Sequence, residues 1–322
     1  MNRAVAALTI WLVSAATGTA QESSTLPLVG VLRIDTPATI GFMARMFREA
    51  LAERGNVEGK NIRLDFRLAN GDATRFPEMA AALVRDRPSV IVASGEAAAQ
   101  AARVASRTIP IVAATNDLLA SGLVASLARP GGNVTGVSLL ITELDAKRLE
   151  VLKQLVPSGR RFGVLNDPAV STPTGLEAIS QTARALGVEI VTVEVRNPNE
   201  IPAAIQSFSE AKVDGVNVLS SPLFNGLREQ LGPLLLKHKL PAICEWREMA
   251  SAGCTASYGT TLRELYGALA GLTDKMLKGA SPAETPAQQP TRSELVINRR
   301  AVQAIGIDIP PTLLARADEV IE

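Results

Sequence analysis

The stretch that decides the fold is Ser89-Val90-Ile91-Val92-Ala93-Ser94-Gly95-Glu96, which runs directly into Ala97-Ala98-Ala99-Gln100. A continuous run of apolar, mostly β-branched residues indicates a parallel strand that is buried on both faces. The alanine-rich segment after it favours a helix. We therefore expect the turn between them at the carboxyl edge of a sheet, where open α/β folds bind ligands.

The turn Ser94-Gly95 is the first candidate binding feature. A hydroxyl group and a bare backbone N–H at the start of a helix suit an anion such as a ligand carboxylate. The alternative is an ordinary N-cap, in which Ser94 serves only its own helix. Because the same order of strand, polar turn and helix recurs along the chain, we favour the ligand site.

Length and composition favour two layered α/β domains. The chain has 322 residues, of which 47% are hydrophobic and only 3% aromatic. Two domains of about 140–150 residues fit this length, since domains of that size are common. With so few aromatic residues, the cores must consist mainly of Val, Ile, Leu and Ala, as in α/β proteins.

Residues 1–20 have the pattern of a cleaved signal peptide. Arg3 precedes an apolar run over residues 4–13, and Gly18-Thr19-Ala20 offers small residues for cleavage. The alternative is an uncleaved N-terminal anchor, but the run is short for a membrane span. No cysteine follows it, so we expect a non-lipidated periplasmic protein. No other run approaches about 18 apolar residues, so we expect no stable membrane insertion.

The charge balance gives information about binding partners, and the two cysteines give information about the redox state of the protein. Without Arg3, the 33 Lys and Arg residues fall to 32, equal to the 32 Asp and Glu residues. A basic excess or stripe is absent, which argues against a nucleic-acid partner. In an oxidising compartment Cys244 and Cys254 could pair. If they belong to neighbouring parallel strands, however, they lie at opposite ends of them, so we predict two free thiols.

The chain alternates strands and helices, and its second half repeats the first. The segment Val29-Gly30-Val31-Leu32 and the segment Phe162-Gly163-Val164-Leu165 are 133 residues apart, and a polar turn follows each. Residues 62–68 alternate apolar and charged, which predicts a strand at or near an edge. The remaining predicted strands are residues 109–113, 134–137, 190–195, 215–219, 241–244, 255–258 and 294–298. Predicted helices include residues 118–127, 262–278 and 301–305.

This repeat predicts two Rossmann-like lobes with parallel sheets and a cleft where their carboxyl edges face one another. We expect the chain to cross between the lobes near residues 139–143, 259–262 and 285–292. The N-terminal lobe would then comprise residues 26–140 and about 262–287. The C-terminal lobe would comprise residues 141–261 and about 288–322.

Motifs for catalysis are missing. The sequence has no G-x-S-x-G, no P-loop, no G-x-G-x-x-G after a strand and no zinc-spaced Cys/His set, so we predict no enzyme, no cofactor and no metal. The single histidine, His238, ends an apolar helix, where a positive side chain complements the helix dipole. A paired-carboxylate enzyme using Asp117 and Glu245 is the remaining catalytic alternative, although acids near strand ends are commonly caps.

Several segments together resemble one protein family. They are residues 57–62, Asp117 with residues 122–136, residues 146–150, Ser257-Tyr258-Gly259 and residues 310–318. The sequence is similar to the ABC transporter substrate-binding proteins that include the tryptophan/tyrosine-type members. The resemblance implies a type I periplasmic binding protein fold: two Rossmann-like lobes, a three-stranded hinge and closure around a small solute. It also implies delivery to an ABC permease that a separate ATPase powers.

The resemblance also indicates which turns line the cleft. Ser94 and Gly95 would hold a carboxylate, Asp117 or Asp167 an amine or hydroxyl, and Trp246 would form an apolar wall unless it belongs to hinge packing or core. The full set of candidate ligand-binding residues is Asp35, Thr36, Ser94, Gly95, Glu96, Thr115, Asn116, Asp117, Asn166, Asp167, Ser220, Glu245, Trp246 and Tyr258.

The sequence therefore predicts the monomeric, periplasmic solute-binding protein of an ABC importer. Its solute would be a small carboxylate-bearing molecule, an amino acid or a related organic acid, which shifts the lobes from open to closed. The alternative is a periplasmic co-receptor for a sensor kinase or chemoreceptor. A repressor with this fold would need an N-terminal helix-turn-helix, and the predicted signal peptide occupies that place.

Overall fold

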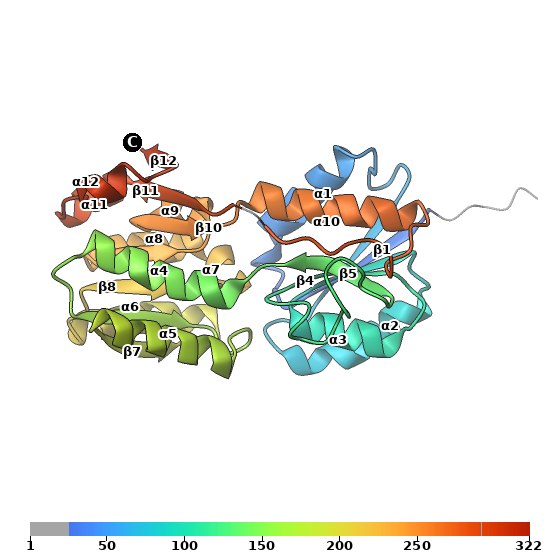
Figure 1. Ribbon diagram of the computed structural model, residues 1–322, viewed down its shortest axis with the longest axis horizontal. Helices are drawn as coiled ribbons and strands as arrows, with labels where there is room; N and C mark the ends of the chain where they lie inside the picture. Colours follow the sequence, from blue (N-terminus) through green and yellow to red (C-terminus); the bar gives the residue numbers. More distant parts are fainter. Residues whose placement is uncertain (1–25, 291) are drawn as a thin grey trace, which may run out of the picture.

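The chain forms two α/β lobes that lie side by side along the long axis of the molecule (Figure 1). The computed structural model describes residues 26–290 and 292–322, so the predicted signal peptide at residues 1–20 lies outside the described residues. Within the described ranges, no helix has both the length and the apolar character needed to cross a bilayer. The predicted two-lobed α/β fold is confirmed.

The N-terminal lobe contains a five-stranded parallel sheet with the order β2-β1-β3-β4-β5. Its strands are β1 (Leu28–Arg33), β2 (Arg63–Leu68), β3 (Val90–Ser94), β4 (Ile111–Thr115) and β5 (Val134–Ser138). Its helices are α1 (Ile40–Ala52), η1 (Ala73–Arg75), α2 (Phe76–Arg85), α3 (Glu96–Ala105) and α10 (Leu262–Leu277). The half-exposed strand β2 lies at the edge, as its alternating sequence predicts.

Strand β3 shows why the apolar run of the sequence is uninterrupted. Val90 and Val92 pack in the cluster that α1 and α10 form on one face, whereas Ile91 and Ala93 pack on the other face with α2 and α3. Successive side chains of a strand point to opposite faces, so a strand covered on both sides needs apolar residues at every position.

The C-terminal lobe contains a seven-stranded sheet with the order β12-β11-β10-β9-β8-β6-β7. Its strands are β6 (Arg161–Asn166), β7 (Glu189–Glu194), β8 (Gly215–Val218), β9 (Ala242–Cys244), β10 (Ala256–Gly259), β11 (Glu294–Asn298) and β12 (Glu319–Ile321). Its helices are α4 (Ile141–Leu155), α5 (Pro173–Leu186), η2 (Pro198–Glu200), α6 (Ile201–Glu210), α7 (Pro222–Gly226), α8 (Arg228–Lys237), α9 (Arg247–Ala252), α11 (Arg299–Ile305) and α12 (Pro311–Leu314).

One strand pair departs from the all-parallel sheets that the sequence predicts. Strands β10 and β11 run antiparallel, while the other pairs of this sheet are parallel. The chain leaves the lobe at the end of β10 and re-enters it from the hinge side at the start of β11, so the two strands run in opposite directions (Figure 1).

Three chain segments connect the sheets. The first leads from β5 to α4, the second from β10 to α10, and the third from Gln288, which pairs with Val137, to β11. Leu140, in the first segment, has a left-handed backbone with φ 54°, which is unfavourable for a residue with a Cβ atom. Helix α10 packs against α1, although more than 200 residues separate them.

The repeated Gly-Val-Leu motif has the same packing role in both lobes. A Cβ atom at Gly30 in β1 would come within 2.5 Å of the Leu83 side chain of α2. A Cβ atom at Gly163 in β6 would come within 2.7 Å of the Phe208 side chain of α6. Both glycines therefore allow a helix to approach the middle of its sheet closely.

The predicted helix over residues 118–127 is wrong, because this segment consists of turns. The Asp117 carboxylate accepts hydrogen bonds from the backbone N–H groups of Leu119 and Ala120, at 2.8 and 3.1 Å. Gly122 then adopts φ 65°. Leu118 and Leu123 are buried, as core-facing residues of a helix would be, but they anchor a loop. An Asx-type turn and a left-handed glycine here compete successfully with helix propensity.

The prediction of two free thiols is also wrong: Cys244 and Cys254 form a disulfide, with their Cα atoms 6.4 Å apart. The prediction assumed that both cysteines lie in the strand ladder. Cys254 lies outside it, in the turn between α9 and β10, and its N–H donates to the carbonyl of Met249. The register of β9 and β10 therefore does not determine the distance between the two residues, which is within bridging range.

Candidate functional site

A cavity of about 480 Å³ lies between the lobes, within the size range of small-molecule sites. The carboxyl ends of β1, β3 and β4 and the starts of α3 and α10 form one wall. The turns after β6, β8 and β9, together with α4 and α5, form the other. The site thus lies at the sheet edge where open α/β folds bind ligands.

The start of α3 presents uncapped backbone N–H groups to this cavity. Gly95, the N-cap residue, has φ 94°, and no side chain caps the helix. The N–H of Gly95 itself donates to the carbonyl of Ala114 at 2.8 Å. The N–H groups of the first turn, which includes the cavity-lining residues Ala97 and Ala98, have no acceptor within the helix.

Thr115, at the end of β4, adds a hydroxyl group to the same wall. The residue is 2% exposed, and its Oγ1 atom has no hydrogen-bond partner among the described residues. Since buried polar groups are almost always hydrogen-bonded, this hydroxyl beside the cavity is a donor and acceptor that the protein itself leaves unused.

Arg33, which follows the apolar part of β1, is the cation of this wall. Its Nε donates to Asp35 at 2.6 Å, and its Nη1 donates to the hydroxyl groups of Ser94 and Tyr266, both at 3.3 Å. Burial raises the pKa of Tyr266, and the nearby Arg33 charge lowers it in part. The cluster holds a buried guanidinium, paired with Asp35, beside the start of α3.

A second arginine–aspartate pair supports the opposite wall, where Asp145 lines the cavity and Arg148 lies behind it. Both residues lie on α4: Arg148 is completely buried and donates through Nη2 to Asp145 and, at 2.6 Å, to the hydroxyl of Ser220. Its Nη1 donates to the carbonyl of Tyr258 at 2.8 Å. The backbone N–H and the hydroxyl of Ser220 both donate to Asp145, at 3.1 and 3.2 Å.

Glu245 adds a carboxyl group next to this pair. It follows β9, lines the cavity and is 8% exposed. Burial raises its pKa to about 7; Arg148 and the hydroxyl of Ser220 act to lower it, and Asp145 acts to raise it. Near neutral pH this carboxyl therefore exchanges readily between its protonated and its ionised form.

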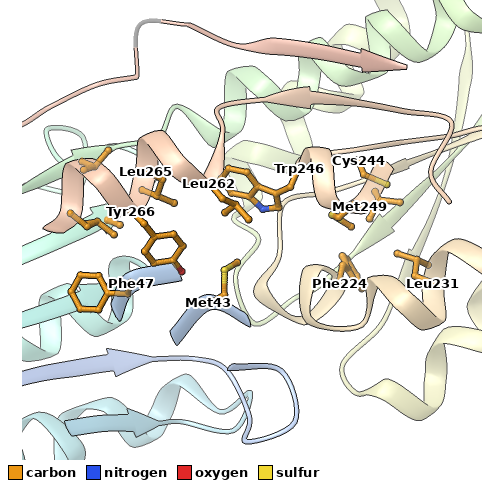
Figure 2. Close-up of a cluster of buried hydrophobic side chains, with 14 of the residues drawn as sticks. Met43, Phe47, Phe224, Leu231, Cys244, Trp246, Met249, Leu262, Leu265 and Tyr266 are labelled. Carbon is orange, nitrogen blue, oxygen red and sulfur yellow. The ribbon is translucent and has the colours of Figure 1, made fainter. Parts of the chain in front are cut away.

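Apolar side chains cover much of the remaining wall. Trp246 of the C-terminal lobe faces Met43 and Tyr266 of the N-terminal lobe, and Leu265 lies close by (Figure 2). Trp246 is 5% exposed and belongs to the same buried cluster as Met43 and Tyr266. It both lines the cavity and contributes to packing, so the two alternatives for this residue are compatible.

The lobes also touch each other at the rim of the cavity. The guanidinium of Arg228 lies 4.4 Å from the ring centre of Phe42, and the Asn225 amide lies 3.7 Å from the sulfur of Met43. On another side, Ala169 and Val170 of the C-terminal lobe pack against the second core cluster of the N-terminal lobe. The two lobes are thus in direct contact on two sides of the cavity.

Eight of the fourteen candidate residues line the cavity together: Ser94, Gly95, Glu96, Thr115, Asn116, Ser220, Glu245 and Trp246. Asn116 also ties the lobes together at the hinge. Its side-chain amide donates to the hydroxyl of Thr142 at 2.9 Å, and its Oδ1 accepts from the Thr142 N–H at 3.1 Å.

The other six candidates lie around the cavity without lining it. Asp35 is bound to Arg33, and Thr36 lies in the turn before α1, where its N–H donates to the Thr39 hydroxyl at 3.0 Å. Asp117 caps its own turn. The Tyr258 side chain packs against the C-terminal core.

Asn166 and Asp167 form the turn after β6. Neither amide atom of Asn166 has a partner among the described residues. The Asp167 carboxylate accepts from the hydroxyl of Ser221 at 2.5 Å and from the Ala169 N–H at 2.9 Å. Burial raises the pKa of Asp167, and these two hydrogen bonds lower it in part. Asp167 thus shapes the turn after β6. The residues that follow in this turn, Ala169 and Val170, contact the N-terminal lobe.

Sequence reasoning missed four polar residues of the site: Arg33, Asp145, Arg148 and Tyr266. The position of Arg33, directly after an apolar strand, could have revealed it. Asp145 and Arg148 are three residues apart on α4, a spacing that usually indicates an exposed ion pair. Tyr266 occupies an apolar position of α10. For the three helical residues, the sequence gives no signal that Asp145 and Tyr266 line a cavity or that Arg148 is buried behind it.

A sequence model of the family described as ABC transporter substrate binding protein matches residues 34–321. The chain belongs to this family. Members of the family bind solutes and are not enzymes, so the prediction that the chain is no enzyme is confirmed. The family also implies a small-molecule ligand, an ABC permease as partner and a place of action outside the cytoplasm.

Relatives agree with this membership. The chain is 28% identical over 281 residues to a tyrosine-binding protein of Clostridioides difficile, which covers 87% of this chain and 81% of the relative. A conserved domain protein from Vibrio cholerae has 28% identity and a TM-score of 0.80, with 92% of this chain and 100% of that chain covered. An ABC domain from Streptococcus pneumonia in complex with L-Trp has 26% identity and a TM-score of 0.77, with the same coverage.

Proposed function

We propose that this ABC substrate-binding protein serves an importer and captures a small carboxylate-bearing solute in the cavity between its lobes. The observation that carries this proposal is the wall around the start of α3, where uncapped N–H groups, the unpartnered Thr115 hydroxyl and the buried Arg33 charge come together. The N–H groups and the hydroxyl can donate hydrogen bonds to an anion, and Arg33, which is paired with Asp35, adds a guanidinium to the same wall.

The apolar part of the cavity supports a solute with a hydrophobic body. Trp246, Tyr266 and Met43 offer aromatic and thioether surface, and the cavity volume of about 480 Å³ is enough for an amino-acid-sized molecule. The relatives point the same way, since one is named for tyrosine and another is in complex with L-Trp. We therefore propose an amino acid or a related organic acid with an apolar side chain.

Capture would proceed by closure of the hinge. A solute that contacts α3 on one side and Glu245 and Trp246 on the other interacts fully only when the lobes are together. Its binding free energy therefore shifts the population from open to closed. The rim contacts between Phe42 and Arg228 add to the closed state and give an ABC permease a surface that differs between the loaded and empty forms.

The location follows from the same proposal. The segment over residues 1–20, with its predicted cleavage after Ala20, would direct export to the periplasm without a lipid anchor. Release of the solute to the permease would then be driven by the transporter's ATPase.

Calorimetry with amino acids and organic acids tests the carboxylate site. We expect binding of apolar amino acids, and loss of binding when the solute carboxylate is converted to an amide. Thr115→Val should weaken carboxylate binding about tenfold or more, since a hydrogen bond to a charged group contributes about 1.5–3 kcal/mol. The matched control is Thr108→Val, at an exposed position away from the cavity. Equal affinity for acid and amide would refute the proposal.

A further inference from the structure

Glu245 differs from the other acidic residues around the cavity in how its charge is compensated. Asp35 is paired with Arg33, and Asp145 is paired with Arg148. Asp167 already accepts hydrogen bonds from Ser221 and Ala169. Arg33 in the described cavity wall and Arg148 behind it are thus each committed to an aspartate. Glu96 at the start of α3 is exposed, so Glu245 remains as the buried carboxyl group in excess.

The charges that face Glu245 come from several elements. Helix α4 contributes Arg148 and Asp145, and Ser220, which follows β8, contributes a hydroxyl group. Across the cavity stand the Arg33–Asp35 pair and Tyr266, while Glu96 lies at the exposed start of α3. On α9, Arg247 binds Glu319 at the surface, and Glu248 carries a further acidic group. No cation in this set is left without an aspartate or glutamate partner.

Strand β10 holds the backbone of Glu245 in place. A Cβ atom at Gly259 would come within 2.8 Å of the Glu245 carbonyl oxygen, so only glycine allows the two segments to approach this closely. On the other side, the disulfide of Cys244 fixes the residue directly before Glu245. The position of the carboxyl group in the cavity is therefore built into the fold.

We propose that Glu245 is the subsite for a positively charged amino group of the solute, which makes the ligand a zwitterion held between the start of α3 and the turn after β9. This inference rests on the proposed function, because it assigns the solute carboxylate to the α3 wall of the same cavity. It replaces Asp117 and Asp167 as the amine-binding residues, since their carboxylates are occupied by their own turns.

A proton competes with the amino group for this subsite. Burial raises the pKa of Glu245 to about 7, so the carboxyl group is largely protonated in the empty cavity at pH 6. An ammonium group favours the ionised carboxylate, and its binding therefore releases the proton. Affinity for a zwitterion should rise as the pH increases through 7, and below that value it should fall by up to about tenfold per pH unit.

The experiment compares matched pairs of solutes that differ only in the amino group. The pairs are L-tyrosine with 3-(4-hydroxyphenyl)propionate and L-tryptophan with indole-3-propionate. Calorimetry is performed between pH 5.5 and 8.5, in two buffers with different ionisation enthalpies, so that proton release is counted directly. We expect the amino acid of a pair to bind about tenfold or more tightly than its deaminated partner at pH 8, and to release a proton on binding at pH 6.

Glu245→Gln keeps the size of the side chain and removes its charge. This variant should lose both the discrimination within a pair and the pH dependence, whereas the exposed Glu53→Gln control should keep them. Equal binding of both members by the unmodified protein would overturn the amino-group subsite and leave the carboxylate proposal standing. If neither member of either pair binds, the proposed function fails together with the subsite.

Discussion

The Nε atom of Arg33 donates to the Asp35 carboxylate over 2.6 Å, and the two side chains are only 7% and 1% exposed. The last residue of β1 and a residue of the turn after it thus place a compensated charge pair beside the cavity. Arg33 reaches the cavity from this pair, while Asp35 stays behind it. The pair explains how a positive charge can be buried at the end of an apolar strand.

Removal of Asp35 should destabilise the protein strongly. Asp35→Ala leaves the buried guanidinium of Arg33 without its carboxylate, and loss of one partner of a buried pair costs about 3–5 kcal/mol. Urea unfolding of the ligand-free protein measures this change. The double variant Arg33→Met, Asp35→Ala should recover most of the loss, and a double variant as unstable as Asp35→Ala would contradict the explanation.

The disulfide should contribute to stability in the oxidised protein. Cys244 and Cys254 are ten residues apart, and in the chain-entropy model a loop of this size corresponds to about 3 kcal/mol. We expect Cys244→Ala, Cys254→Ala to unfold at a lower urea concentration, and a thiol titration of the unmodified denatured protein to find no free thiol. If a reducing agent leaves the unfolding midpoint of the unmodified protein unchanged, this stabilisation is absent.

Closure of the lobes should depend on Gly226. A Cβ atom at this position of α7 would clash with the side chain of Thr39, which belongs to the other lobe. Gly226→Leu should therefore hinder closure and weaken solute binding about tenfold or more, while the unfolding midpoint stays nearly the same, because overpacking costs about 1–3 kcal/mol only in the closed state. Small-angle scattering with and without solute would follow closure.

The control for that variant lies in the N-terminal lobe. A Cβ atom at Gly41 on α1 meets no other atom within 4 Å, so Gly41→Ala should bind solute normally. If both variants bind equally well, the contact between Gly226 and Thr39 does not limit closure.

The stability of the ligand-free protein should depend on pH through Glu245. Because the pKa of Glu245 rises from 4.5 to about 7 on folding, the folded state binds more protons than the unfolded state between these values. Its contribution to stability is therefore complete below about pH 4.5 and is lost as the pH rises through 7, with a total of up to about 3 kcal/mol. Glu245→Gln should flatten this part of the unfolding profile between pH 5 and 8.

Sequence reasoning found the parts of the fold that depend on local pattern. The apolar run predicted the doubly buried strand β3, the alternation predicted the edge strand β2, and the repeat of the segments around Gly30 and Gly163 predicted two similar lobes. The segment after Asp117 misled the prediction, because a side-chain cap and a left-handed glycine outweigh apolar spacing. The disulfide was missed because a turn, and not strand register, brings Cys254 to Cys244.

The site was accessible to sequence reasoning only where it follows strands. Ser94, Thr115 and Glu245 come directly at strand ends, and topology alone brings such positions to one edge. Arg148 and Tyr266 lie on helices, and their burial follows from how α4 and α10 pack after the chain has crossed between lobes. This information is tertiary and leaves no mark in spacing or composition.

The three crossings between the lobes also constrain biosynthesis. Helix α10, which covers one face of the N-terminal sheet, and Gln288, which pairs with β5, are among the last parts of the chain to be made. A polypeptide threaded N-terminus first through a narrow translocation channel can therefore complete neither half until nearly all of it has emerged. Under the proposed export, the cores of both lobes would therefore form only on the far side of the membrane.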